Sequence, residues 1–170
     1  MQSIVLIGFM GSGKTTVGEV LAARSGAKFT DTDKIIESNE GKSISEIFET
    51  VGEEGFRRLE NTVLSGLSKL SGNGLVISTG GGIVTKPENI PLLKKAGLVV
   101  WLRVNPETVV KRLEGDKTRP LLAGGDPLKK VEKLMRERQS CYAAAADVII
   151  DCDDLRADEI VNLVLQKCGK

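Results

Sequence analysis

Short apolar runs rich in β-branched residues recur along this chain, and segments with helical spacing of apolar positions separate them. Five of these runs read as strands, covering residues 3–7, 28–30, 75–78, 98–102 and 148–150. Most are apolar on both faces, as strands are when helices cover both sides of a parallel sheet. The alternation therefore predicts an α/β fold with a five-stranded parallel sheet and helices on both faces.

The predicted helices carry start signals. Ser43 and Glu46 form a capping box at the start of a short helix. A long amphipathic helix is expected from Gly52 onward. Its apolar stripe comprises Phe56, Leu59, Val63, Leu64, Leu67 and Leu70. Asn105 and Pro106 are the expected N-cap and first residue of a further helix.

Length and charge narrow the class of protein. The chain has 170 residues, and residues 1–170 are expected to form a single domain. Lys and Arg number 24 against 23 Asp and Glu, so neither a nucleic acid nor a membrane surface is implied as a partner. No apolar run approaches membrane-spanning length, and no leader is expected. No exposed apolar pattern indicates a protein partner, so we expect a monomer.

The content of histidine and cysteine limits the catalytic and metal-binding sites that the chain can form. The chain has no histidine, which excludes a Ser-His-Asp triad and a histidine metal site and leaves acid-base work to carboxylates. The three cysteines, Cys141, Cys152 and Cys168, have no metal-type spacing. They indicate reduced thiols in a cytoplasmic protein.

A phosphate-binding motif follows the first strand directly. Gly8, Gly13, Lys14 and Thr15 match G-x-x-x-x-G-K-[ST], between a strand and a helix. Such a loop turns successive N–H groups toward one centre at a helix N-terminus, where a phosphate binds. Lys14 is placed for the β- and γ-phosphates and the Thr15 hydroxyl for Mg²⁺. The motif indicates a P-loop nucleotide-binding fold, as in the nucleoside-monophosphate kinases, rather than a turn that merely packs.

Two aspartates, Asp31 and Asp33, stand at the carboxyl end of the second strand. Ligands bind at this edge of open α/β sheets, so one carboxylate suits Mg²⁺ through water and the other a substrate hydroxyl. The alternative is that Asp33 only caps the helix that follows.

Arg57 and Arg58 begin the long helix, and at most one of them is expected to face a given pocket. Glu60 lies one turn after Arg57 and is placed to pair with it, which would hold the guanidinium in a fixed pose. A solvated surface pair is the alternative.

A glycine triplet follows the third strand, at Thr79-Gly80-Gly81-Gly82. Three glycines allow a ligand to approach the main chain closely, with free N–H groups as donors. A tight turn is the alternative, although it needs only one glycine.

Residues 112–125 are interpreted as a lid. Glycines flank a segment that holds Lys117, Arg119 and Pro120, a composition suited to closing over phosphates and supplying one arginine. An ordinary solvated loop is the alternative.

Other nucleotide-binding classes fit less well. The chain has neither the N-K-x-D nor the D-x-x-G segment of GTPases. Its third strand ends in Ser78-Thr79-Gly80, where a mechanical ATPase usually carries an acidic Walker B residue. A small kinase with a lid is the class that remains.

Taken together, the motifs resemble those of shikimate kinase over nearly the whole chain. They occur in that family's order: the P-loop, Asp31-Thr32-Asp33, Phe56-Arg57-Arg58-Leu59-Glu60, the glycine triplet, Arg119-Pro120-Leu121-Leu122, and Leu134-Met135 with Arg138 and Tyr142. The resemblance implies that ATP phosphorylates the 3-hydroxyl of shikimate, a step of aromatic amino-acid (chorismate) biosynthesis. It also implies an acceptor-binding segment at about residues 32–61.

The resemblance assigns roles residue by residue. Lys14, Asp33 and Arg119 are the implied catalytic residues, with Asp33 as base and Arg119 as the lid arginine. The implied ATP contacts are Gly11, Ser12, Gly13, Lys14, Thr15, Thr16, Arg112 (against the adenine) and Arg119. The implied acceptor contacts are Asp33, Phe48, Phe56, Arg57, Glu60 (which orients Arg57), Gly80, Gly81, Gly82 and Arg138. Thr15, with Asp31 through water, is the implied Mg²⁺ site.

One departure concerns the adenine. Some relatives have a basic residue and then a proline after the last strand, where this chain has Leu155 and Ala157 on either side of Arg156. Two alternatives stay open: another small-molecule P-loop kinase, of the gluconate type, and a nucleotide-binding paralogue without catalysis. Such paralogues tend to lose Lys14, the aspartates or the lid arginine, and this chain keeps them.

Overall fold

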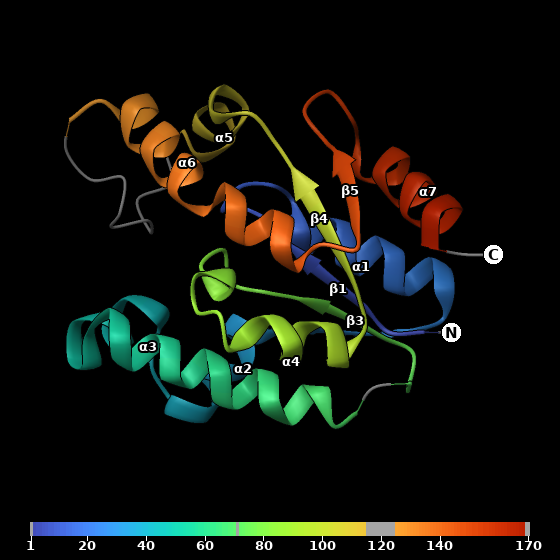
Figure 1. Cartoon of the computed structure of the whole chain (residues 1–170), viewed down its shortest axis with the longest axis horizontal. Helices are drawn as coiled ribbons and strands as arrows, with labels where there is room; N and C mark the ends of the chain where they lie inside the picture. The colour runs from blue at the N-terminus through green and yellow to red at the C-terminus, as the bar shows by residue number, and fades with distance from the viewer. Residues whose placement is uncertain (1, 71, 115–124, 169–170) are drawn as a thin grey trace.

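The computed structural model describes residues 2–70, 72–114 and 125–168. The elements are β1 (Ile4–Ile7), α1 (Lys14–Ser25), β2 (Lys28–Asp31), α2 (Thr32–Glu40), α3 (Ile44–Ser68), β3 (Leu75–Ser78), η1 (Ile83–Thr85), α4 (Asn89–Ala96), β4 (Leu98–Arg103), α5 (Pro106–Leu113), α6 (Pro127–Ala145), β5 (Val148–Asp151) and α7 (Ala157–Cys168). Figure 1 shows their arrangement.

The five predicted strands form one parallel sheet in the order β2-β3-β1-β4-β5, which confirms the predicted fold class. The central strand β1 pairs with β3 on one side and with β4 on the other. In these parallel pairings Ile4 lies opposite Val76 of β3 and Leu98 of β4. Because all strands point the same way, their carboxyl ends and the loops that follow them gather at one edge. The phosphate loop and the glycine triplet both begin there.

Helices cover both faces of the sheet, as Figure 1 shows for α1 and α7 on one face and α4 on the other. Successive residues of β1 alternate between two buried cores. Leu6 packs with Val17 of α1 and Val161 of α7, whereas Ile7 packs in the core that contains Leu93 of α4. This alternation is why the strands are apolar at every position.

The start signals behave mostly as predicted. The Ser43–Glu46 capping box is confirmed, and α3 contains a kink at Gly52, where φ is 69°, so a short helix does precede a long one. Asn105 stands at the N-cap of α5, but its side chain does not cap the helix. The carboxylate of Asp153 accepts from the Asn105 N–H instead, at 2.7 Å.

The predicted apolar stripe of α3 is wrong at its end. The helix stops at Ser68, and Leu70 is 47% exposed beyond it. In the described part of the chain, no helix is both long and apolar enough to cross a membrane.

Candidate active site

The phosphate loop joins β1 to α1. Gly8 has a φ of 151°, and a side chain there would meet the Leu102 carbonyl oxygen at 2.6 Å, so only glycine fits. Lys14 is 8% exposed, and its Nζ donates to the carbonyls of Gly8 at 2.8 Å and Phe9 at 2.9 Å. These contacts hold the ammonium group against the loop, where the motif places it.

The Thr15 hydroxyl donates to Asp31 Oδ2 at 3.1 Å, which brings the start of α1 to the end of β2. Asp31 also caps α2, because its Oδ1 accepts from the N–H groups of Asp33 at 3.0 Å and Lys34 at 3.4 Å. The alternative that Asp33 caps this helix is therefore wrong. A hydroxyl beside a carboxylate is a donor set that fits Mg²⁺, which prefers hard oxygen ligands.

The glycine triplet packs against the phosphate loop. An ideal Cβ on Gly81 would lie 3.1 Å from the backbone nitrogen of Met10. The N–H of Gly80 donates to Thr32 Oγ1 at 3.1 Å, so the expectation of a free N–H at Gly80 is wrong. The N–H groups of Gly81 and Gly82 donate to no other residue that the structure describes. These two groups remain available as donors to a ligand.

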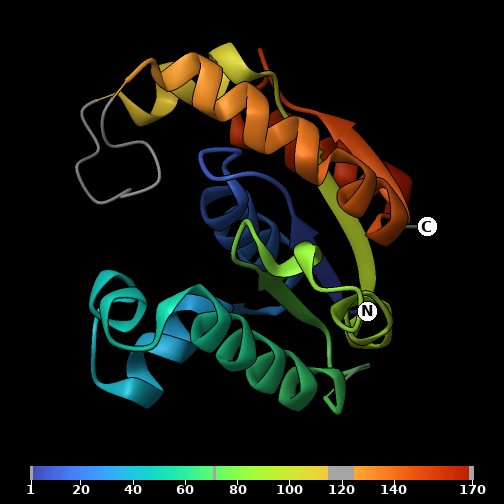
Figure 2. The same cartoon turned by 60° about the vertical axis from the view of Figure 1, so that its left-hand side comes forward.

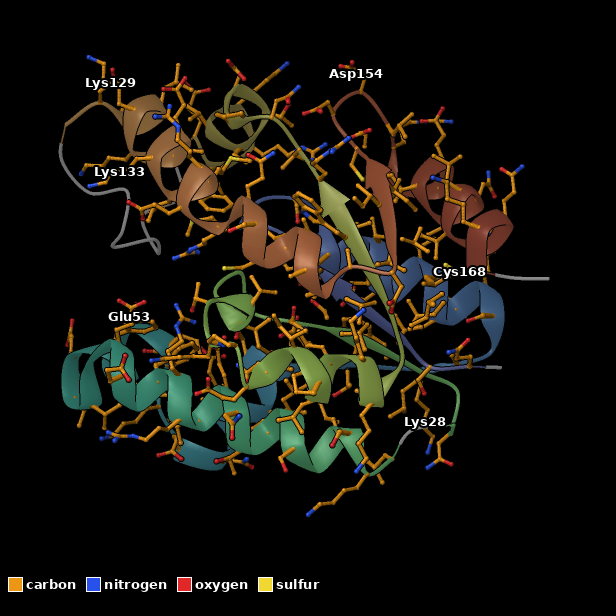
Figure 3. The ribbon with its side chains drawn as sticks, in the orientation of Figure 1. Lys28, Glu53, Lys129, Lys133, Asp154 and Cys168 are labelled. Carbon is orange, nitrogen blue, oxygen red and sulfur yellow. The ribbon has the colours of Figure 1, made fainter. Side chains whose placement is uncertain are left out.

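Arg57 faces this turn from α3, and its neighbour Arg58 is exposed, as the helical spacing predicts. Arg57 Nη1 lies 2.6 Å from Glu60 Oε2, with side chains 6% and 0% exposed. The alternative of a solvated surface pair is therefore wrong. Glu53 adds a contact to Arg57 Nη2 at 3.2 Å that the sequence did not predict, and Figure 3 shows Glu53 on the side of α3 that faces α6.

Glu60 is a buried acid of the site with a strongly raised pKa. Burial, with a smaller contribution from the negative charge of Asp33, raises its pKa to about 7 against the opposing effects of Arg57 and Arg138. Its Oε1 has no hydrogen-bond partner among the described residues. Glu60 therefore holds Arg57 with one oxygen and takes up a proton more readily than an ordinary glutamate.

We expect this carboxyl to make the free energy of unfolding pH-dependent. Between pH 4.5 and about 7 the native chain retains a proton that an unfolded glutamate has lost. The contribution of Glu60 to the free energy of unfolding therefore falls as pH rises. Glu60→Gln removes the titrating carboxyl group. The loss in free energy of unfolding between pH about 5 and about 7.5 should therefore be smaller in this variant by on the order of 2 kcal/mol. Urea unfolding of both proteins at pH about 5 and about 7.5 measures the difference.

Glu54→Gln is the matched control on the same helix. Glu54 is exposed, and its hydrogen bond with Lys86 lowers its pKa, so this variant should not reproduce the effect. Identical pH profiles for the wild type and Glu60→Gln would show that Glu60 has an ordinary pKa.

Two glycines of the triplet leave room for the charged side chains. A Cβ on Gly80 would lie 2.5 Å from Glu60 Oε1 and 2.8 Å from Asp33 Oδ1. A Cβ on Gly82 would lie 2.2 Å from Arg57 Nη2. The triplet is therefore more than a tight turn, because Asp33, Glu60 and Arg57 all close on it.

Gly80→Ala should displace the two carboxylates and reduce phosphoryl transfer at least about tenfold, with a stability loss of about 1–3 kcal/mol. Activity assays and thermal unfolding measure the two effects. Gly66→Ala in α3 is the matched control: nothing lies within 4 Å of its Cβ position, so it should leave activity unchanged and stabilise the helix by about 1 kcal/mol. Full activity in Gly80→Ala would contradict the close approach.

Helix α6 supplies Arg138, which is 7% exposed and lies with its guanidinium carbon 5.7 Å from the ring centre of Phe9. One turn later, Tyr142 donates a hydrogen bond to the carbonyl of Gly81. Figure 2 shows the phosphate loop and the glycine turn between α6 on one side and α2 with α3 on the other. Arg138 and Arg57 thus approach the turn from opposite layers.

The two aromatic residues predicted to lie beside the acceptor, Phe48 and Phe56, both belong to α3. The rings of Phe48 and Phe56 stack with centres 4.5 Å apart, and Arg57 Cζ lies 5.6 Å from the Phe56 ring centre. Stacking and the adjacent guanidinium give this side of the site an apolar surface with a cation at its end.

The residues predicted to contact the nucleotide are only partly among those that the structure describes. Arg112 donates to the carbonyls of Gly11 at 3.2 Å and Cys152 at 3.0 Å, between the phosphate loop and the end of β5. Nearby, Leu155 packs against the core, whereas the side chain of Arg156 is 82% exposed. Arg119, and with it most of the proposed lid, lies outside the described residues.

The structure thus brings the predicted groups of five separate segments to one edge of the sheet. It also adds residues that the sequence did not single out for a role in the site: Thr32, which holds Gly80; Glu53, which contacts Arg57; and Phe9, which lies under Arg138. The sequence indicates these residues only by their positions. Thr32 lies between the two aspartates, Glu53 lies in the helix that carries Arg57, and Phe9 lies inside the phosphate loop.

Comparison with known proteins agrees with this geometry. The family model for shikimate kinase matches residues 10–169. The chain belongs to the shikimate kinase family. It is 43% identical to a shikimate kinase of Caldanaerobacter subterraneus subsp. tengcongensis, over 98% of this chain and 95% of that protein. It is 44% identical to a shikimate kinase of a Sulfurihydrogenibium species, over 98% of each chain.

Solved structures agree with the family assignment. Shikimate kinase from Acinetobacter baumannii, in complex with shikimate, superposes with a TM-score of 0.93 at 39% identity, over 99% of this chain and 93% of that one. The chain is therefore a P-loop kinase of the shikimate kinase family, as its motifs predict.

Proposed function

We propose that the site described above transfers the γ-phosphoryl group of ATP to the 3-hydroxyl of shikimate, as a step of aromatic amino-acid biosynthesis. One observation carries the assignment of residues: Asp33, Glu60 and Arg57 close on a glycine turn whose other side packs against the phosphate loop. An acceptor bound at the turn lies next to the terminal phosphate of a nucleotide bound in the loop.

The acceptor carboxylate is assigned to the two arginines. Arg57 and Arg138 are both nearly buried, and guanidinium groups match carboxylates with two parallel hydrogen bonds. The N–H groups of Gly81 and Gly82 add donors, and the stacked Phe48 and Phe56 cover the ring. Residues 32–61 act as the acceptor-binding segment in this proposal.

In the transfer step, the acceptor oxygen forms a bond to the γ-phosphorus while the bond from that phosphorus to the β–γ bridging oxygen breaks. Asp33 accepts the hydroxyl proton, and ADP leaves with the bridging oxygen. A loose transition state needs alignment and positive charge more than a strong base. Lys14 supplies that charge from the loop, and we assign Arg119 the same task from the lid at residues 112–125.

Mg²⁺ is assigned to Thr15, which would ligate it directly, and to Asp31, which would hold it through water. A bound Mg²⁺ neutralises charge on the β- and γ-phosphates. The 3.1 Å hydrogen bond between the two side chains supports this placement, because it holds two hard oxygen ligands side by side at the phosphate loop.

Asp31→Asn should raise the Mg²⁺ concentration that gives half-maximal activity about tenfold or more, because it removes the charge while keeping an oxygen. Asparagine caps helices as well as aspartate, so α2 and the thermal midpoint should be preserved. Mg²⁺ titrations of initial rate measure the shift, and chelation should abolish activity in both proteins. An unchanged Mg²⁺ requirement would exclude Asp31 from the metal site.

An acceptor panel tests the activity itself. ATP and Mg²⁺ are offered with shikimate, gluconate and nucleoside monophosphates, and ADP release is measured. We expect turnover with shikimate only. Turnover with gluconate instead would favour the alternative kinase, and ATP binding without any turnover would favour a non-catalytic paralogue.

We propose a monomer in the cytoplasm. Among the residues that the structure describes, the exposed large apolar side chains are Val51 of α3, Leu70 just beyond that helix and Ile149 of β5, so they do not share one element. All three cysteines are free thiols, which suits a reducing compartment. Light scattering coupled to size exclusion tests the oligomeric state.

A further inference from the structure

The glycine turn is anchored from three directions. Both the N–H and the hydroxyl of Thr79 donate to the Leu6 carbonyl, at 3.2 Å and 2.9 Å, which ties the turn to β1. Gly80 donates to Thr32 of α2. Tyr142 of α6 donates to the carbonyl of Gly81. Only the last of these links reaches the helix that carries Arg138.

Tyr142 is held firmly in place. Its side chain is 3% exposed, and its ring stacks on Trp101 of β4 with centres 5.3 Å apart and planes at 18°. Tyr142, Trp101 and Phe9 also line a common cavity of about 360 Å³. Burial raises the pKa of Tyr142, so the hydroxyl stays protonated and remains a donor.

The hydrogen bond acts on the peptide that carries a proposed acceptor contact. The Gly81 carbonyl and the Gly82 N–H belong to one trans peptide plane and point in opposite directions. A donor on the carbonyl therefore sets the direction of that N–H and polarises it. Gly82 itself lies against the Arg57 guanidinium.

We propose that Tyr142 is a positioning residue for the acceptor carboxylate. It joins α6, which carries Arg138, to the glycine turn, which carries the N–H donors of Gly81 and Gly82. The distance between Arg138 and the main-chain donors is then fixed, so that one carboxylate can bind to both at the same time. This inference rests on the proposed function.

Tyr142→Phe removes the hydroxyl and keeps the ring. We expect KM for shikimate to rise about three- to tenfold, the effect of one lost hydrogen bond, with kcat and KM for ATP within about twofold. Initial rates with each substrate varied in turn measure the split. An unchanged KM for shikimate would overturn the inference.

Val131→Ala is the matched control, because Val131 is fully buried on the same helix but belongs to the other core. It should lower the thermal midpoint at least as much as Tyr142→Phe and leave KM for shikimate unchanged. An equal rise of KM in both variants would show that α6 packing is responsible, and would overturn the inference.

A second readout uses an acceptor in which the carboxylate of shikimate is reduced to an alcohol. The ratio of wild-type to Tyr142→Phe kcat/KM should fall to about 1 with this acceptor, since the positioned donors have no carboxylate to bind. The same ratio with both acceptors would overturn the inference. Failure of the unmodified chain to phosphorylate shikimate would instead overturn the proposed function.

Discussion

Lys14→Met should reduce kcat by about 10²–10³-fold or more and leave the dissociation constant of shikimate within about threefold of wild type. Methionine keeps most of the length of the side chain and removes the charge that meets the transferring phosphoryl group. The acceptor is held by other elements, so its binding energy is untouched. ADP release measures kcat, and titration calorimetry measures shikimate affinity.

Lys28→Met is the matched control for loss of a lysine charge. Lys28 is exposed at the amino end of β2, the opposite end of that strand from Asp31, and Figure 3 shows it away from the phosphate loop. This variant should behave as wild type. A tenfold or larger loss of shikimate binding in Lys14→Met, with normal catalysis at saturation, would contradict the role given to Lys14.

Arg57→Ala should raise the dissociation constant of shikimate about 30- to 1000-fold, because it removes a desolvated two-point contact to the carboxylate. The rate at saturating shikimate should fall much less, since Arg57 does not touch the reacting phosphate in the proposed arrangement. Arg57→Lys should recover little, because an ammonium group cannot reproduce the guanidinium fork. Titration calorimetry measures the affinity.

The neighbouring Arg58 provides the matched control. It occupies the same helix and carries the same charge, but it is exposed. Arg58→Ala should bind shikimate normally. The fold of Arg57→Ala is expected to survive because Glu60, whose pKa burial already raises to about 7, takes up a proton once its partner is gone. Unchanged shikimate affinity in Arg57→Ala would rule out the carboxylate role.

Local chemistry explains why much of this enzyme could be predicted. The phosphate loop is recognised from the spacing of Gly8, Gly13, Lys14 and Thr15. This spacing predicts a turn whose N–H groups bind phosphate in any protein that contains it. Strands that are apolar on both faces are buried on both faces, which requires a sheet with helices packed against each side. The capping box at Ser43 is complete within four residues.

Other features depend on contacts between distant segments. The Arg57–Glu60 spacing fits a surface pair as well as a buried one, and only the packing of α3 on the glycine turn removes it from water. The cap of α2 is local but was also missed: the helix begins at Thr32, earlier than the sequence predicted, which makes Asp31 rather than Asp33 its N-cap.

By itself, the sequence determined the fold class and the phosphate loop, since both follow from patterns within short segments, and it named the charged residues that the structure brings to one edge of the sheet. Only the tertiary structure decided which arginine is buried, that Gly80 is bound by Thr32, and that Tyr142 reaches Gly81 across 61 positions. Burial and long-range hydrogen bonds are properties of the packed chain, and no local pattern encodes them.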